Sequence, residues 1–140
     1  MKMKFRQLAS KSQLKRYFRW ATAPEHDFKR PQVISVTGAA GNIAYALFPR
    51  LISGELLGPD RPIILKLIDV PSRMDVLKGV AMELEDMASP LLHNVIITDS
   101  LQEGFADSEF AFLIGARAQD KGVERSELLK FNTKIFIDNG

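Results

Sequence analysis

The residues with the clearest chemical signature form a glycine turn, Gly38 to Gly41, between an apolar run and an amphipathic segment. Glycine lets the backbone bend sharply and approach a ligand closely, and the free N–H groups at the start of a helix attract anions. The G-x-x-G-x-x-A spacing, which ends at Ala44, therefore predicts a turn that binds a pyrophosphate. The residues of this turn that we expect to contact the ligand are Gly38, Ala40, Gly41, Asn42 and Ile43.

A carboxylate closes the next apolar run, which starts at Pro62 and ends at Asp69. At the tip of a strand, a carboxylate accepts hydrogen bonds from both hydroxyls of an adenosine ribose, and its charge repels a 2′-phosphate. These two features together favour NAD over NADP as the cofactor. The interval from Gly41 to Asp69 exceeds the usual spacing of roughly 20 residues, and we attribute the excess to a lengthened connection over residues 53–61.

The elements that must position these groups alternate between strand and helix. Strands are predicted over residues 33–37, 63–69, 95–98 and 110–114, and helices over residues 42–52 and 74–87. Such alternation predicts an α/β fold of the Rossmann type, a parallel sheet of strand order 3-2-1-4 with helices on both faces. The ligand then lies at the carboxyl ends of the strands, where the order reverses. We therefore add Gly115 and Ala116 to the expected cofactor contacts.

The last segment carries two conflicting signals. Residues 124–132 have a helical pattern, with Leu128, Leu129 and Asn132 along one side, whereas residues 134–137 have strand propensity. We expect one continuous helix.

Composition excludes several classes of protein and reveals an uneven charge. The chain has no cysteine, which rules out disulfides and thiolate chemistry, and no apolar run reaches the ~20 residues that span a bilayer. Residues 1–30 carry nine Lys and Arg against two acids, and the remainder carries ten against fifteen. We interpret residues 1–30 as a basic extension, either disordered or a leader.

The composition of residues 1–24 suits three interpretations. These residues contain no acid and mix cations with serines and large apolar side chains, which is typical of a transit presequence, of a nucleic-acid or membrane-surface patch, or of a solvated leader. We favour the solvated leader and expect no nucleic-acid or membrane partner. The expected compartment is the cytoplasm, or the mitochondrion if residues 1–24 act as a transit peptide.

Several motifs, in order and at compatible spacing, resemble the cytosolic-type malate dehydrogenases of the lactate/malate dehydrogenase superfamily. They are the glycine turn from Thr37, the strand that ends at Asp69, the stretch Gly79 to Asp86 with Pro90 to Leu92, Gly115 to Arg117, and Gly122 to Leu129. The resemblance covers residues 31–140. It implies an NAD-dependent oxidoreductase of the tricarboxylic acid cycle, which transfers a hydride between NAD and the C2 of malate or oxaloacetate.

The resemblance also implies two substrate contacts. Arg125 corresponds to the loop arginine that closes over the substrate and can polarise its oxygen or bind a carboxylate. Gln119 stands where malate dehydrogenases normally have an arginine for the second carboxylate, and a neutral amide there is similar to lactate dehydrogenases. The substrate is therefore expected to be a small 2-hydroxy or 2-keto acid. The family resemblance favours malate, whereas Gln119 favours a lactate-type substrate.

No catalytic residue and no metal site are expected within the chain. In the family the catalytic His and Asp lie beyond the position of Gly140, and neither His26 nor His93 is expected to replace them. We therefore expect residues 31–140 to be an incomplete NAD-binding domain that ends before the catalytic domain. The resemblance also implies that the helix from Met74 to Met87 can pair two copies in a homodimer. The alternative function is a catalytically inactive nucleotide-binding or interaction remnant.

Overall fold

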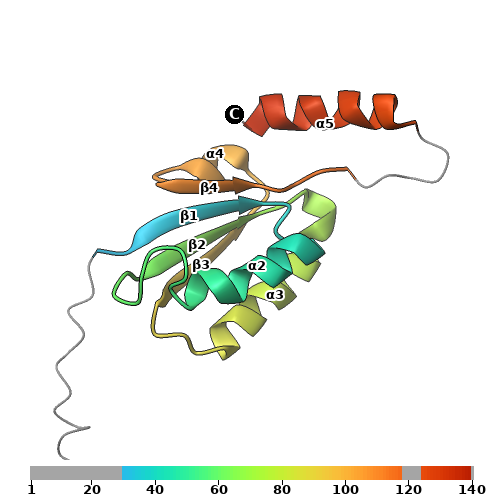
Figure 1. Ribbon diagram of the computed structural model, residues 1–140. Helices are drawn as coiled ribbons and strands as arrows, with labels where there is room; N and C mark the ends of the chain where they lie inside the picture. The colour runs from blue at the N-terminus through green and yellow to red at the C-terminus, as the bar shows by residue number, and fades with distance from the viewer. Residues whose placement is uncertain (1–29, 118–123, 140) are drawn as a thin grey trace, which may run out of the picture.

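In the computed structural model, which describes residues 30–117 and 124–139, the four expected strands form one parallel sheet (Figure 1). The strands are β1 (Gln32–Thr37), β2 (Ile63–Ile68), β3 (Leu92–Thr98) and β4 (Phe110–Leu113). The other elements are α2 (Asn42–Ile52), the short 3-10 turn η1 (Pro71–Arg73), α3 (Met74–Asp86), α4 (Leu101–Phe105) and α5 (Arg125–Asn139). The strand order is β3-β2-β1-β4, which confirms the predicted topology.

Strand β1 lies between β2 and β4 and is buried over its last four residues. Ile34 pairs with Leu65 of β2 and Phe110 of β4, and Thr37 pairs with Ile68 and Leu113. Because both faces of a parallel sheet are covered, its strands are apolar on both sides, and β-branched residues suit them. This register brings the ends of β1, β2 and β4 to one edge of the sheet.

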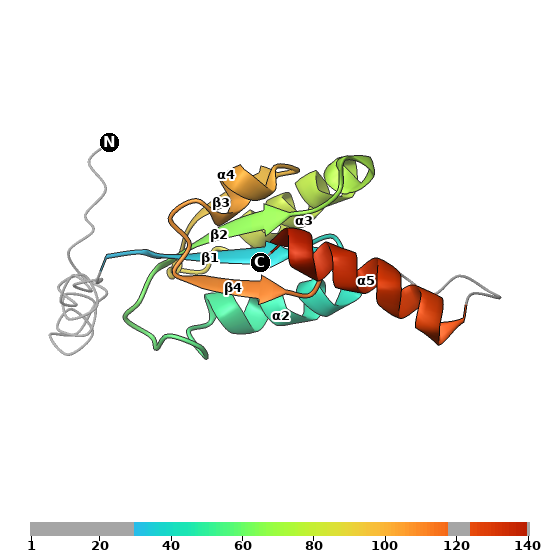
Figure 2. The same cartoon turned by 90° about the horizontal axis from the view of Figure 1, so that it is seen from above.

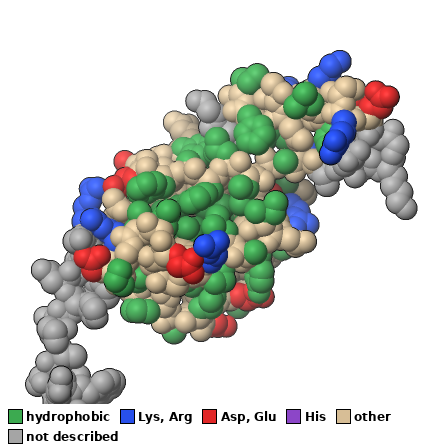
Figure 3. Space-filling model, viewed as in Figure 1, with side chains coloured by type: hydrophobic (Ala, Val, Ile, Leu, Met, Phe, Trp, Pro, Cys, Tyr) green, Lys and Arg blue, Asp and Glu red, His purple; other side chains and the backbone are tan. Residues whose placement is uncertain are grey.

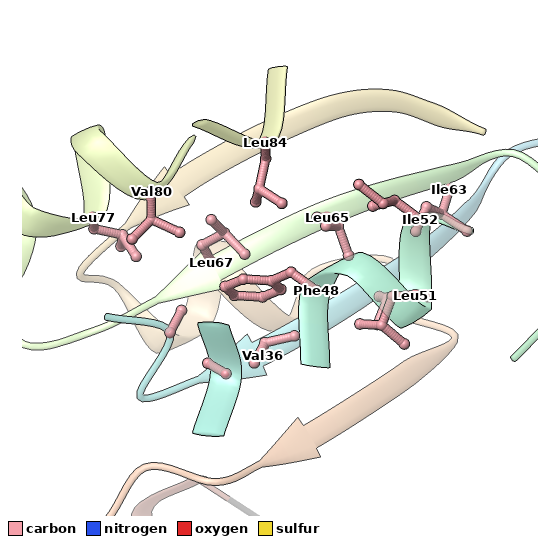
Figure 4. Packing of buried hydrophobic residues seen from close by; sticks show 13 residues of the cluster. Val36, Phe48, Leu51, Ile52, Ile63, Leu65, Leu67, Leu77, Val80 and Leu84 are labelled. Atoms are coloured by element: carbon pink, nitrogen blue, oxygen red, sulfur yellow. The ribbon is translucent and has the colours of Figure 1, made fainter. Parts of the chain in front are cut away.

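Helices α2 and α3 cover one face of the sheet, below it in Figure 1. Phe48 of α2 is completely buried, and Figure 4 shows its ring pointing at the strands beside Val36 and Leu67. Leu77 and Leu84 of α3 complete this layer. Burying each side chain of this size stabilises the fold by about 1.5–3 kcal/mol, so this layer fixes the start of α2 relative to β1.

The opposite face carries α4, a helix of five residues that the sequence did not predict. Ser100 caps it by accepting a hydrogen bond from the Glu103 N–H at 3.4 Å. The Lys66 ammonium, on the buried side chain of β2, donates to the carbonyls of Glu103 at 3.0 Å and Ala106 at 2.7 Å. The Ser35 hydroxyl also donates to the Gly104 carbonyl at 2.6 Å, so polar contacts with β1 and β2 attach this short helix to the sheet. Its presence confirms helices on both faces.

The predicted last helix is confirmed as one continuous element, α5. It lies on the same side of the sheet as α4 (Figures 1 and 2). Arg117 connects it to the end of β4: its N–H donates to Asn132 Oδ1 at 2.9 Å, and its Cζ lies 4.7 Å from the centroid of the Phe131 ring. Residues 134–137 are helical despite their strand propensity, and they do not extend the sheet beyond β4.

One predicted boundary differs by more than a residue. Strand β3 begins at Leu92 rather than Val95, because Ile63 pairs with Leu92 and Ile64 with Asn94, a register shift that leaves one extra residue in β3. His93 therefore lies within this strand, exposed, rather than in the connection before it.

The outer edge of β4 has no neighbouring strand in the described part of the chain. Hydrophobic side chains gather in the middle of the face shown in Figure 3, where Figure 1 places this edge. Phe110 is among the exposed ones, with 39% of its surface accessible. An edge of this kind presents both unpaired backbone groups and apolar surface.

Two further predictions concern the basic extension and membrane insertion. The basic extension lies outside the described residues except for Arg30, which forms an exposed ion pair with Glu109 at 3.0 Å. Among the described residues, we find no helix with the length and apolarity that crossing a bilayer requires.

Candidate nucleotide-binding site

The turn after β1 is built around two glycines that face each other. Gly38 has φ +65°, and a Cβ placed on it would lie 2.5 Å from the Cα of Gly115. A Cβ on Gly115 would in turn lie 3.1 Å from the Gly38 nitrogen. The Gly115 N–H donates to Thr37 Oγ1 at 3.2 Å and joins the end of β1 to the segment after β4. Only residues without a side chain fit this contact, so bare backbone lines the edge of the sheet.

Helix α2 starts directly behind this turn with its N-terminus open. The Gly41 N–H donates to the Gly38 carbonyl at 2.9 Å and closes the turn. Gly41 is the N-cap residue, no side chain caps the helix, and its first turn has no acid. The first N–H groups of a helix have no intrahelical acceptor and carry the positive end of its dipole. The N–H groups of Asn42 and Ile43 are therefore suited to an anion.

Ala44 is a small residue because α2 packs closely on the sheet at this position, and not because a ligand approaches it. Its side chain is completely buried in the hydrophobic core under α2. Ile43, one residue earlier, is 71% exposed. The third position of the glycine pattern therefore needs a small residue for close contact between α2 and the sheet.

Asp69 follows β2 and lies against the glycine turn. Its Oδ2 accepts a hydrogen bond from the Ala40 N–H at 2.8 Å, and its Oδ1 accepts one from the Val70 N–H at 2.8 Å. Its own N–H donates to the Thr98 carbonyl at 3.3 Å. Two backbone N–H groups thus hold the half-buried carboxylate, and the third hydrogen bond fixes the Asp69 backbone to the end of β3. Each carboxylate oxygen has a second lone pair that remains available to a ligand.

Arg73, at the end of η1, completes this side of the site. Its Nη2 donates to the Ala40 carbonyl at 2.8 Å. Ala40 therefore uses its N–H for Asp69 and its carbonyl for Arg73. The sequence analysis did not single out Arg73, although a cation four residues after the strand-terminal acid was a signal that could have found it.

The structure brings together most of the residues predicted from the sequence and leaves others apart. Gly38, Gly41, Asp69 and Gly115 meet at one edge of the sheet, and exposed Ala116 follows directly after them. Arg125 is exposed at the start of α5, and the described residues show no hydrogen bond or ion pair between it and this turn. Gln119 lies outside the described residues.

The other titratable residues that the structure describes lie apart from this site. His93 lies near the start of β3, at the opposite edge of the sheet from the glycine turn. Glu83 on α3 forms a hydrogen bond with Tyr45 and, with its negative charge, raises the pKa of that phenol. Among residues 30–117 and 124–139 no three acids or histidines gather as a metal site.

These groups fit a dinucleotide. The facing glycines leave a surface that a Cβ would fill, the helix start supplies N–H donors to a pyrophosphate, and the carboxylate stands at the ribose position of such folds. These groups can bind and orient a cofactor.

Comparison with known proteins places this geometry in a family. Residues 32–140 match the model of the lactate/malate dehydrogenase NAD-binding domain. The malate dehydrogenase of Naegleria fowleri is 39% identical with a TM-score of 0.77, over 81% of this chain and 35% of that chain. The Trichomonas vaginalis lactate dehydrogenase in complex with NADH and oxamate is 38% identical with a TM-score of 0.69, over 77% and 32%.

The chain spans about a third of the length of these structures. An apo variant of the Trichomonas enzyme gives a similar match, with 37% identity and a TM-score of 0.73 over 79% of this chain and 33% of that one. The residues matched by the family model include the glycine turn and Asp69. The chain belongs to the lactate/malate dehydrogenase family, and residues 32–140 are its NAD-binding domain.

Proposed function

We propose that this chain supplies the cofactor-binding part of an NAD-dependent malate dehydrogenase, which interconverts malate and oxaloacetate. The observation that carries the proposal is the Asp69 carboxylate, which the Ala40 and Val70 N–H groups hold beside the glycine turn. A bound NAD accepts or supplies the hydride. The residues of this chain bind the cofactor, orient it and set which dinucleotide enters.

Each part of the site has one role in this proposal. The pyrophosphate lies on the turn from Gly38 to Gly41 and receives hydrogen bonds from the first N–H groups of α2. Asp69 accepts hydrogen bonds from the adenosine ribose hydroxyls. Gly115 and Ala116 allow the dinucleotide to cross the end of β4 without meeting a bulky side chain. Ala40 acts through its peptide group, because its N–H orients the carboxylate.

The substrate in this proposal is a small 2-hydroxy or 2-keto acid. Arg125 binds a carboxylate or polarises the substrate oxygen, and Gln119 contacts the other end of the substrate. Malate is supported by similarity to the Naegleria malate dehydrogenase, whereas Gln119 and the similarity to the Trichomonas lactate dehydrogenase support a lactate-type substrate. We retain malate, and place the enzyme in the cytoplasm, or in an organelle if residues 1–24 are a transit peptide.

A binding experiment tests the cofactor role. NADH fluorescence titration should show binding to the chain, and Asp69→Ala should weaken it about 10- to 100-fold, since each hydrogen bond to a charged group contributes about 1.5–3 kcal/mol. Asp138→Ala is the matched control, because Asp138 is an exposed acid near the end of α5. Unchanged affinity in Asp69→Ala would refute the ribose role.

A turnover experiment separates the dehydrogenase from the alternative function. NADH oxidation by the chain with oxaloacetate, and separately with pyruvate, gives both activity and substrate preference. Turnover with oxaloacetate would support malate dehydrogenase activity. Turnover with pyruvate alone would contradict it and indicate a lactate dehydrogenase activity. NADH binding without turnover favours the inactive nucleotide-binding remnant for this chain on its own.

The homodimer is proposed through α3. Val76, Met82 and Met87 are exposed apolar side chains on or next to this helix, with exposed fractions of 47%, 65% and 50%. Beside them, α2 and α3 border a groove of about 440 Å³. Sedimentation velocity should show a dimer that Met82→Glu dissociates and Leu129→Glu on α5 leaves intact. A dimer that survives Met82→Glu would contradict this interface.

A further inference from the structure

Helix α5 carries Arg125, the proposed substrate arginine, at its start. None of the described side chains of this helix is buried, and Leu129, Phe136 and Ile137 are exposed apolar residues. The helix reaches past the carboxyl end of β4, on the α4 side of the sheet (Figure 2). Its position therefore depends on a few specific contacts rather than on extensive apolar burial.

Arg117 makes two such contacts, with consecutive residues of α5. Its N–H donates to Asn132 Oδ1 at 2.9 Å, and its Cζ lies 4.7 Å from the centroid of the Phe131 ring. A guanidinium within about 6 Å of a ring centroid is attracted by the negative face of the ring. Because one contact uses the backbone and the other uses the side chain, together they fix both the position of α5 and its rotation about its own axis.

The backbone before Arg117 is fixed to the nucleotide site. The Gly115 N–H donates to Thr37 Oγ1 at 3.2 Å, and Gly115 faces Gly38 across the glycine turn. Only Ala116 separates Gly115 from Arg117. A short stretch of chain thus connects the cofactor-binding edge of the sheet to the contacts that hold α5.

The same contacts set where Arg125 stands. Arg125 lies six residues before Phe131, which is about 9 Å along the axis of one continuous helix. A helix moves as a unit, so a shift at Phe131 and Asn132 also displaces Arg125 relative to Gly115. Such a shift matters, because a misplacement of about 1 Å can slow a reaction about 100-fold.

We propose that Arg117 is a positioning residue of the substrate site. Through Phe131 and Asn132 it holds α5, and with it Arg125, at a fixed place beside the bound cofactor. Arg117 itself contacts neither the cofactor nor the substrate. This inference rests on the proposed function and adds which residue places the substrate arginine.

The test measures energy transfer from a tryptophan on α5 to bound NADH, which reports the distance between them. Trp20 is the one tryptophan of the chain, so Leu129→Trp in a Trp20→Phe background places a single donor at an exposed position of α5. At saturating NADH, the transfer reports where the helix lies in the folded, cofactor-bound protein and not how stable the protein is.

Losing the guanidinium should release α5. Arg117→Gln should lower the energy transfer and should speed hydrogen exchange of the α5 amides about two- to fivefold, since an exposed cation–π contact is lost. Arg117→Lys keeps the cation and should restore most of both signals. Asn132→Ala removes the other contact and should lower the transfer as well.

Two controls make the result specific. Lys134→Gln removes an exposed cation of α5 that makes neither contact, and should leave the transfer and the exchange unchanged. NADH affinity, from the same titrations, should be the same in Arg117→Gln as in the parent protein. A loss of affinity in Arg117→Gln would mean that Arg117 binds the cofactor directly, and would overturn the inference.

The remaining outcomes separate the inference from the proposed function. If Arg117→Gln binds NADH with unchanged transfer and exchange, Arg117 does not position α5 and the inference fails alone. If the native chain binds no NADH, the proposed NAD site fails and the inference fails with it. Lower transfer in Arg117→Gln, with recovery in Arg117→Lys and no effect of Lys134→Gln, supports the positioning role.

Discussion

Replacing Gly38 by alanine tests whether the glycine turn depends on its two facing backbones. The residue has φ +65°, where a non-glycine residue costs roughly 1–2 kcal/mol. The new Cβ would also lie 2.5 Å from the Gly115 Cα and 2.9 Å from its nitrogen. Both neighbours are backbone atoms, so one strand end must shift, at a further cost of about 1–3 kcal/mol for an overpacked site.

The two terms together predict that Gly38→Ala lowers the free energy of unfolding by about 2–5 kcal/mol. Small domains have only about 5–15 kcal/mol of stability, so the loss should be large. Gly79 on α3 is the matched control: it is exposed, and a Cβ there meets nothing within 4 Å. Gly79→Ala should raise stability by about 0.5–1 kcal/mol, because alanine favours helices.

Urea unfolding followed by circular dichroism gives the midpoint and slope of each protein, and NADH titration gives its affinity. We expect a lower midpoint and weaker NADH binding for Gly38→Ala, and a higher midpoint with unchanged binding for Gly79→Ala. Equal stability of the native chain and Gly38→Ala would refute the argument, because it would mean that the ends of β1 and β4 separate without cost. Lower stability in both variants would show that the effect is not specific to the glycine turn.

Three further predictions concern other elements. Lys66→Met should lower stability by about 1–3 kcal/mol for each of the two carbonyls, of Glu103 and Ala106, left without this donor, measured by urea unfolding; no change would contradict the role of Lys66 in holding α4. Because the pKa of Tyr45 is raised in the folded state, its contribution to stability is present below the unfolded pKa and is lost as pH rises through the folded one. Glu83→Ala should therefore lower the pKa of Tyr45, followed by phenolate absorbance in a Tyr17→Phe background, and an unmoved titration would exclude the Glu83 contact. In a complete enzyme Gln119→Arg should raise the preference for oxaloacetate over pyruvate by about tenfold or more, from the ratio of kcat/KM values, and an unchanged ratio would refute the substrate role of Gln119.

The parts of the fold that the sequence could predict are those set by local constraint. The strands β1 and β2 are mostly apolar, which suits a parallel sheet covered on both faces, and they end at recognisable signals, the glycine turn and Asp69. Helix α2 has apolar residues on one side and starts where the glycines end. Strand order followed from the alternation of strand and helix, because right-handed crossovers leave few alternatives.

The parts that the sequence could not predict depend on contacts between distant segments. Helix α4 is five residues long and contains a glycine, and Lys66, 37 residues before Glu103, supplies much of its attachment. The early start of β3 comes from a register shift beside Ile63, which no periodicity reveals. The hydrogen bonds from the Ala40 and Val70 N–H groups to Asp69 involve peptide groups, so the side chains at those two positions carry no signal of them.

The residues that we assign to cofactor choice and those that we assign to substrate choice lie on different parts of the sheet. The group that we assign to cofactor choice, Asp69, lies directly after β2, where its carboxylate accepts a hydrogen bond from the Ala40 N–H. Those that we assign to the substrate, Gln119 and Arg125, come after β4, and β1 lies between β2 and β4 in the sheet. Since sites with no shared partners contribute nearly additively, cofactor preference and substrate preference should respond independently to substitution. A cofactor switch at Asp69 is therefore expected to leave the choice of keto acid unchanged.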